Sequence, residues 1–409
     1  MNKGDRMIDI NRYNNYHCHN HESNRTTLDC VVKPIDYIKR IKELGHTLYF
    51  TTQHGWTGKY LQAYDLCKEN NIKMVYSAEL YIVPDRTVSD NRNYHIMIIG
   101  KNREAFYQLN EIMSESNISG FYYKPRIDLE LLLRLDPNNF IITSACVGGF
   151  LRDKEAIETF FAPILKHFKS NFYLEVQAHV HPRQIQHNKL MLYLRKKYNV
   201  GIIHGNDSHY IYPEQAKDRD KFLKGKGLRY EEEEGFILDF PDTESIIERY
   251  HQQGLLTDEE INEALKNTLV FDECEDLNFT KDVKMPSIYH GINPNKKLRE
   301  ILTEKWKKER KHIPKHRWSE YEQAIYYETN IVEKTNMADY FLLNERIVDV
   351  AVNKYNGVLT RTGRGSAVSF YINKLLGFTE IDRLEAPIPL YPTRFMSISR
   401  ILETKSLPD

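Results

Sequence analysis

The chain has 409 residues, 41% of them hydrophobic, and its 57 lysines and arginines balance 57 aspartates and glutamates. This length suits two or three domains of about 150 residues, and the apolar content is enough for full cores. Zero net charge excludes recognition of nucleic acid through a global electrostatic field, so such contacts need local basic patches.

Strand-like runs alternate with amphipathic helical segments between about residues 13 and 209. The runs are YNNYHCH, TLYFTTQH, KMVYSAELYIV, NYHIMIIG, NFIITSAC, NFYLEVQAH and NVGIIHGND. The first helical segment has Pro34 at the favoured first position and Gly45 as its stop. Strands that each precede a helix predict parallel pairing, in an open doubly wound sheet or a barrel.

The pattern becomes helical and charged from about residue 243. Two helices are predicted within 243–277, and two longer ones follow a linker that contains Pro286 and Pro294. The basic run KWKKERKHIPKHR could contact DNA phosphates, although a solvated helix face explains it equally well. The last 60 or so residues read as mixed α/β. We place a domain boundary near 276–285.

Secretion and membrane insertion are not predicted. The five cysteines include no Cys-x-x-Cys pair, and an odd number cannot form a complete set of disulfides. The first residues lack an apolar stretch of signal-peptide length, and no apolar run approaches about 18 residues. We therefore expect a soluble cytoplasmic protein that does not bind membranes.

Ligand-type side chains stand near the ends of the strand-like runs, where α/β barrels gather catalytic groups. His17-x-His19 places two imidazoles on one face of a strand, and Asp207-x-His209 repeats this spacing. The runs between them supply, in chain order, His54, Glu79, His95, Cys146 and His179. Imidazole, carboxylate and thiolate together suit zinc, manganese or iron.

Each of these motifs is weak alone. A lone His-x-His is mostly chance, Cys146 reads as a small buried hydrophobe, and His95 beside Ile96 reads as a core histidine. Their joint occurrence predicts a multinuclear metal site, which would activate water and stabilise charge on a phosphate ester. The residues themselves thus predict a metallohydrolase but not its substrate.

Four segments resemble the PHP (polymerase and histidinol phosphatase) domain of C-family bacterial DNA polymerases: TTQHGWTGKYLQAYDLCKENNIKMVYSAELYIV, SGFYYKPRIDLELL, TSACVGG and HGNDSHYIYPEQA. The resemblance implies a distorted seven-stranded (β/α)7 barrel over residues 10–280. An incomplete α/β polymerase palm, of nucleotidyltransferase type, would follow over residues 281–409.

The resemblance also implies a ligand set for up to three divalent metals. Its positions correspond to His17, His19, Asp29, His54, Glu79, His95, Cys146, Asp207 and His209. The spacing from His19 to Asp29 is longer than usual, so Glu22 and His21 are alternatives to Asp29. Asp207 and His95 are the expected catalytic residues. His179 and His181 are expected to support ligands, contact phosphate or lie on the surface.

A second resemblance, to the start of the polymerase palm, covers NMADYFLLNERIVDVAVNKYNGVLTRTGRGSAVSFYINKLLGFTEIDRLE. Its Gly363-Arg364-Gly365-Ser366 loop is expected to open a helix and bind a triphosphate, since glycines admit the backbone and arginine contacts phosphate. Arg394 resembles a family arginine near the nucleotide. In the family, the aspartates that hold magnesium follow SLPD, so this chain alone is not expected to synthesise DNA.

These observations predict the N-terminal region of a replicative DNA polymerase, with a metal-dependent 3′–5′ exonuclease in its PHP domain. The alternatives are a small-molecule phosphatase of histidinol-phosphate type and a structural barrel that braces the polymerase. The palm-like tail disfavours the first, and the full ligand set disfavours the second. The expected partners are DNA and, in a complete polymerase, deoxynucleoside triphosphates, a sliding clamp and a clamp loader.

Overall fold

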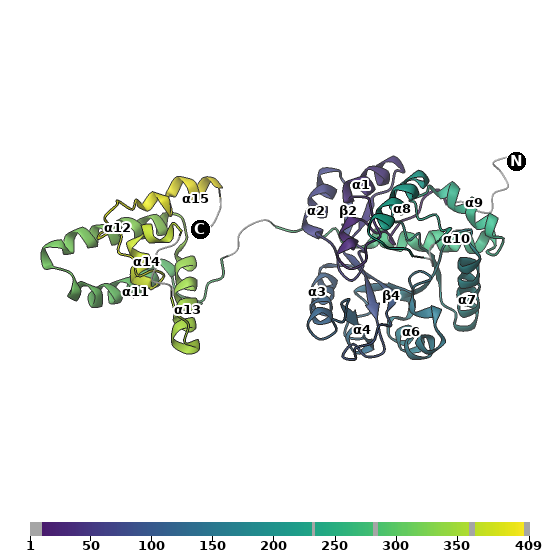
Figure 1. Cartoon of the computed structure of the whole chain (residues 1–409), viewed down its shortest axis with the longest axis horizontal. Helices are drawn as coiled ribbons and strands as arrows, with labels where there is room; N and C mark the ends of the chain where they lie inside the picture. Colours follow the sequence, from purple (N-terminus) through teal and green to yellow (C-terminus); the bar gives the residue numbers. More distant parts are fainter. Residues whose placement is uncertain (1–9, 231–233, 281–284, 360–364, 405–409) are drawn as a thin grey trace. The chain divides into compact units, whose positions relative to one another are not determined.

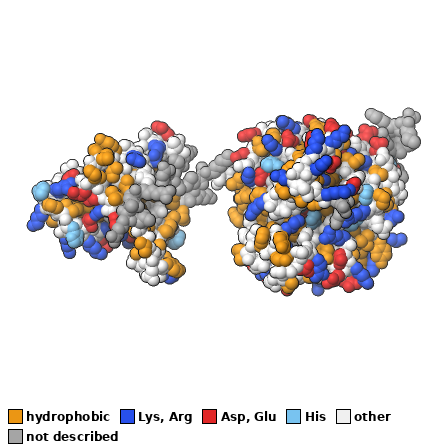
Figure 2. Space-filling model, viewed as in Figure 1, with side chains coloured by type: hydrophobic (Ala, Val, Ile, Leu, Met, Phe, Trp, Pro, Cys, Tyr) orange, Lys and Arg blue, Asp and Glu red, His pale blue; other side chains and the backbone are white. Residues whose placement is uncertain are grey.

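A computed structural model describes residues 10–230, 234–280, 285–359 and 365–404. The chain forms two compact units, Met1–Phe279 and Thr280–Asp409, called here the first and second unit (Figure 1). None of the described helices combines the length and apolar character needed to cross a membrane. On the face shown in Figure 2, acidic and basic side chains are interspersed, in keeping with the zero net charge.

The first unit is built on a six-stranded sheet in the order β5-β3-β4-β6-β7-β8 and on a separate pair, β1-β2. The strands are β1 (Leu48–Phe50), β2 (Lys73–Val75), β3 (Ser77–Ile82), β4 (Tyr94–Gly100), β5 (Arg126–Ile127), β6 (Phe140–Thr143), β7 (Phe172–Val176) and β8 (Ile202–His204). The pairs β1-β2, β3-β5, β6-β7 and β7-β8 are parallel. Strand β4 is antiparallel to both β3 and β6.

The predicted α/β class is confirmed, but the prediction of uniformly parallel strands is wrong for β4. Residues 83–93, which join β3 to β4, contain no helix. A parallel connection needs a crossover of a dozen or more residues, so this short segment returns the chain in the opposite direction. The first predicted strand is also reduced to an isolated bridge between Cys18 and Ser208. Because β4 is reversed, its first residues lie at the edge where the parallel strands end.

Helices pack around these strands (Figure 1). They are α1 (Pro34–Glu43), α2 (Tyr60–Glu69), α3 (Arg103–Ile118), α4 (Leu129–Leu132), α5 (Lys154–Ala156), α6 (Ala162–Phe168), α7 (Pro182–Tyr198), α8 (Ala216–Gly225), α9 (Thr243–Gln253) and α10 (Asp258–Asn267). Helix α1 begins at Pro34, as predicted, and Gly45 follows its end with φ of +69°. Residues 96–99 of β4 are fully buried, as expected of a strand covered on both faces.

The second unit consists of helices around an aromatic core. They are α11 (Pro294–Glu309), α12 (Trp318–Lys334), α13 (Ala338–Tyr355), α14 (Tyr371–Leu376) and α15 (Ile398–Thr404). Trp306 stacks on Tyr321 in this core, and Phe370 packs edge-on against Phe395. The mixed α/β character predicted for the last 60 or so residues is wrong for those described, which contain no strand. A short apolar run forms a strand only beside a partner that pairs with its backbone.

Candidate metal centre

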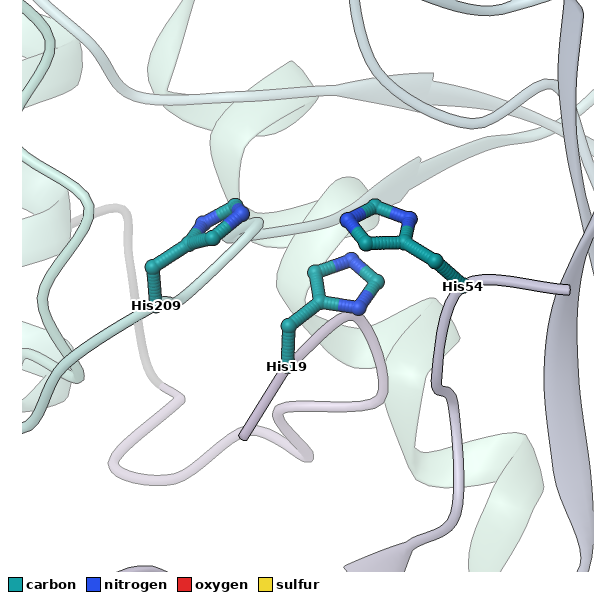
Figure 3. Close-up of side chains that lie close together, drawn as sticks. All are labelled: His19, His54 and His209. Carbon is teal, nitrogen blue, oxygen red and sulfur yellow. The ribbon is translucent and has the colours of Figure 1, made fainter. Parts of the chain in front are cut away.

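The predicted ligands come from separate segments that meet at one edge of the sheet. Glu79 lies inside β3, and His95, the second residue of β4, pairs in register with Tyr81 of β3. The others lie on loops before β1 or after β1, β6 and β8, and they are His17, His19, Asp29, His54, Cys146, Asp207 and His209. Figure 3 shows His19, His54 and His209 converging from three loops. We call these nine side chains the metal centre.

Glu79 is fully buried at the middle of the metal centre. Its Oε1 lies 3.3 Å from Nε2 of His17 and 3.0 Å from Nδ1 of His95. Its Oε2 lies 2.5 Å from Nδ1 of His54 and 3.5 Å from Nε2 of His19. One carboxylate therefore faces imidazoles from three segments of the chain, an arrangement that can bridge cations.

Asp207 and Cys146 form a second group with His17, and Asp207 contacts the same His17 nitrogen as Glu79 does. Asp207 Oδ1 is 3.2 Å from Nε2 of His17 and 3.3 Å from Nε2 of His19. The ligand atoms of His17, Cys146 and Asp207 form one group within 4.8 Å. Asp207 has φ of +51° and Ala145, before Cys146, has φ of +60°. Such backbone strain in residues other than glycine is typical of functional sites.

Asp29 lies in the metal centre and the proposed substitutes do not. Its Oδ2 is 2.9 Å from Nε2 of His54 and 3.3 Å from Nε2 of His209. His21 and Glu22 instead pair with each other, and neither lies in a described ligand group. Cys30, which was not predicted as a ligand, donates its thiol to Asp29 and shares a ligand group with Asp29 and His209.

Unpaired polar atoms at the centre fit bound cations. His17 Nε2, His19 Nε2, His54 Nδ1 and both oxygens of Glu79 are buried and face one another at 2.5–3.5 Å, yet none of them makes a hydrogen bond of normal geometry within the described structure. A buried polar atom without a hydrogen bond costs about 1–3 kcal/mol, and a cation that these lone pairs coordinate would offset that cost. Imidazole, carboxylate and thiolate donors in groups of three suit divalent transition metals.

The pKa shifts of these side chains also favour the binding of divalent cations. Burial raises the pKa of Glu79, Asp29 and Asp207, but the surrounding imidazoles lower each pKa more, to well below its usual range. Burial and the neighbouring His54 lower the pKa of His19 to about 3. Against burial, Asp29 and Glu79 raise the pKa of His54 to about 10, so a metal must displace a proton there.

Glu175 is a candidate functional residue that the sequence analysis missed. It is fully buried on β7, and its Oε1 lies 2.7 Å from Nδ1 of His17, opposite the nitrogen that faces Glu79 and Asp207. Carboxylates in this position orient a ligating imidazole and raise its basicity. The available signal was a charged residue, in FYLEV, at an inward position of an apolar strand.

The two histidines predicted to support the ligands have different surroundings. His179 is buried against Phe236, and neither of its ring nitrogens has a hydrogen-bond partner in the described structure. Burial lowers its pKa to about 4, although the nearby Asp207 opposes this. His181 caps α7, where its Nδ1 accepts the Arg183 N–H at 3.2 Å. His179 thus lies near the metal centre and outside its ligand groups.

The predicted triphosphate loop is partly described. Gly363 and Arg364 lie outside the described residues. Gly365 has φ of +77°, which favours glycine, and Ser366 Oγ is buried without a described partner. Ser366 is the N-cap of a short 3-10 helix, Ala367–Ser369, and α14 begins two residues later at Tyr371. Arg394 ends a second 3-10 turn.

Comparison with known proteins finds a family match in each of the two units. Residues 17–179 match the PHP domain, and residues 296–409 match the bacterial DNA polymerase III alpha NTPase domain. The first unit thus contains a region that matches the PHP domain. An amidohydrolase from Chromobacterium violaceum is 14% identical in an alignment that covers 48% of this chain and 87% of its own, with a TM-score of 0.32.

The chain is related to the DNA polymerase III alpha subunits of bacteria and matches their N-terminal part, which confirms the recognition from sequence. It is 27% identical over 436 residues to the subunit of Aquifex aeolicus, with 96% of this chain and 35% of the relative covered. It is 26% identical over 414 residues to that of Borreliella burgdorferi, with 96% and 34% covered. The chain therefore spans about a third of these relatives.

Proposed function

We propose that the first unit is a metal-dependent phosphoesterase that hydrolyses DNA from its 3′ end, within the N-terminal region of a replicative polymerase. The observation that carries this proposal is the buried cluster of ligand atoms that converge on Glu79 without normal hydrogen-bond geometry among the described residues. Divalent metals bound there would supply Lewis acidity toward a phosphoryl group. The relationship to polymerase alpha subunits supports DNA as the substrate class.

Differences in exposure support separate roles for the ligands. The side chains of His95 and Asp207 are 21% and 15% exposed, whereas those of His17, His19 and Glu79 are fully buried. His95 and Asp207 therefore line the side from which a phosphodiester would enter, and we propose them as the catalytic residues. The buried ligands would fix the positions of the cations, because packing on every side holds their rotamers.

The second unit supports a wider role in replication. We propose a PHP domain over residues 10–280 and the start of a palm over 281–409, with the Gly363–Ser366 loop contacting a nucleoside triphosphate. In a complete polymerase, magnesium would serve the synthetic site, and a sliding clamp and a clamp loader would be partners. This role in replication would imply a cytoplasmic location.

The test compares a 3′-labelled oligonucleotide with a small phosphate monoester as substrates of the full chain. We expect nucleotides to be released from the oligonucleotide, the release to stop with chelator, and manganese to restore it. Asp207→Asn and His95→Ala should each lower the rate at least about 10–100-fold. Asp218→Asn and His251→Ala, on exposed positions of α8 and α9, are matched controls and should keep it.

Other outcomes identify the alternatives. Hydrolysis of the monoester alone would favour the small-molecule phosphatase. Metal uptake that raises the melting temperature, without hydrolysis of either substrate, would favour a structural barrel. A rate that neither substitution changes would belong to a contaminant and would contradict the proposed site.

A further inference from the structure

The loop that joins α3 to β5 lies beside the metal centre and contributes no ligand to it. Lys124 Nζ on this loop is 3.1 Å from Thr27 Oγ1 and 3.3 Å from the hydroxyl of Tyr81. The Tyr81 ring packs in turn against His54 and His95, with centroids 6.3 and 5.3 Å apart. The Lys124 ammonium group is therefore one side chain away from two ligands.

Lys124 is a half-buried cation without a carboxylate partner. Its ammonium group contacts neutral hydroxyls and the face of the Tyr81 ring, whose centroid is 4.4 Å away, and no described carboxylate oxygen lies within 4.0 Å. Burial lowers its pKa, and the attraction of Asp29 and Glu79 only partly opposes this. Because burying an unpaired charge is costly, the position favours an incoming anion such as a phosphate.

Two aromatic side chains on the same loop face solvent. Phe121 is 60% exposed and Tyr123 is 78% exposed, whereas Tyr122 lies under the guanidinium of Arg126 at 5.4 Å. Tyr123 has φ of +58°, which is rare for a bulky residue, and the Tyr122 N–H donates to the Lys124 carbonyl to fix the turn. The fold thus maintains local strain and at the same time exposes apolar rings next to a cation. We call residues 119–125 the aromatic loop.

We propose that the aromatic loop binds single-stranded nucleic acid at the entrance to the metal centre. Tyr123 stacks on a base, and Lys124 contacts the backbone phosphate next to it. Aromatic rings beside cations are the general means of holding single strands without regard to sequence. The inference rests on the proposed function and narrows its substrate, because a small monoester has a phosphate for Lys124 but no base for Tyr123.

Binding is measured apart from hydrolysis, by the fluorescence anisotropy of labelled oligothymidylate with the full chain in chelator. Stacking contributes about 1–3 kcal/mol per base, so Tyr123→Ala should raise Kd roughly 5- to 150-fold, and Tyr123→Phe should stay near wild type. Lys124→Ala should weaken binding and reduce the slope of log affinity against log salt by about 0.7, and Lys124→Arg should restore both. Melting temperatures confirm that each variant is folded.

A matched pair on α7 serves as the control. Tyr193 is 57% exposed, and Lys197 Nζ lies 5.6 Å from its ring centroid, so the two offer the same chemistry away from the aromatic loop. Tyr193→Ala and Lys197→Ala should bind oligothymidylate like wild type. If Tyr123→Ala and Lys124→Ala bind no more weakly than these controls, the proposal is wrong.

The outcomes separate this inference from the proposed hydrolysis. If the chain binds DNA through Tyr123 and Lys124 but releases no nucleotide, binding by the aromatic loop is supported and the exonuclease activity is contradicted. If both loop variants release nucleotides with the KM of wild type, only binding by the aromatic loop is contradicted. Unchanged DNA binding, together with loss of a replisome protein from the loop variants, would overturn the proposal in favour of a protein partner.

Discussion

Replacing Glu175 by glutamine tests whether the metal centre depends on support from β7. Glu175 Oε1 accepts from Gln177 Nε2 at 2.7 Å and lies 2.7 Å from His17 Nδ1. Its Oε2 accepts from the hydroxyls of Tyr16 and Thr143 at 2.6 and 3.0 Å. A glutamine side chain has one oxygen that accepts hydrogen bonds and one nitrogen that donates them. The hydroxyls of Tyr16 and Thr143 can rotate and accept from that nitrogen.

The magnitude follows from these contacts. Hydrogen bonds to a charged group contribute about 1.5–3 kcal/mol each. The two that the glutamine oxygen keeps, with Gln177 and His17, weaken when the charge is removed. We therefore expect Glu175→Gln to lower the free energy of unfolding by about 1–3 kcal/mol. Metal affinity should fall about 10–100-fold, because His17 loses the anion that orients it.

The assay is a competitive metal titration against a chelating dye, combined with urea unfolding. Glu328→Gln is the matched control, because Glu328 is equally buried but lies in the second unit, where it bonds Arg383 and the Ile372 N–H. It should change stability without changing metal affinity. If Glu175→Gln binds metal as tightly as wild type, the idea that Glu175 positions His17 is refuted.

Three further predictions follow from the first unit. Elemental analysis of protein purified without added metal should find zinc, manganese or iron at about one or more equivalents, and no uptake on titration would contradict the site. Gly205→Ala should lower metal affinity about tenfold, because a Cβ there would lie 2.3 Å from the carboxyl group of Glu175, whereas Gly225→Ala, with open space around it, should not. Burial lowers the pKa of His204 to about 3, so below pH 6.5 the unfolded chain takes up a proton that the folded chain does not. The stability that this group contributes is complete above about pH 6.5 and falls by about 2 kcal/mol at pH 5. Urea unfolding of the metal-free protein at these two pH values should show this loss in the wild type, and His204→Gln should lack it.

The sequence predicted the α/β class and the convergence of the ligand-type residues, because both depend on local patterns. His17 and His19 are two residues apart on one segment, and strand ends meet at one edge whatever lies between them. His95 lies beside Glu79 for a reason other than the predicted one. It is the second residue of β4, so the reversal of that strand, and not a C-terminal strand end, brings it to Glu79.

Other features depended on tertiary structure. A single glutamate in FYLEV has no local signature, so the contact of Glu175 with His17, 158 positions away, could not be read from a pattern. The backbone conformations of Tyr123 and Asp207 were hidden for the same reason, since neither is a glycine that would signal positive φ. The direction of β4 was set by the length of a connection that alternation of strand and helix does not reveal.

The bridge between Cys18 and Ser208 has a consequence for biosynthesis. His19 N–H donates to the Ser208 carbonyl at 2.7 Å, and Ser208 N–H donates to the His17 carbonyl at 3.1 Å. The segment with the N-terminal ligands, His17 and His19, is therefore hydrogen-bonded to the segment with the last ligands, Asp207 and His209. Contacts between residues this distant in sequence form late in folding. The nascent chain cannot assemble its full ligand set until translation has passed His209, so shorter intermediates would bind cations only through partial sets and exchange them freely.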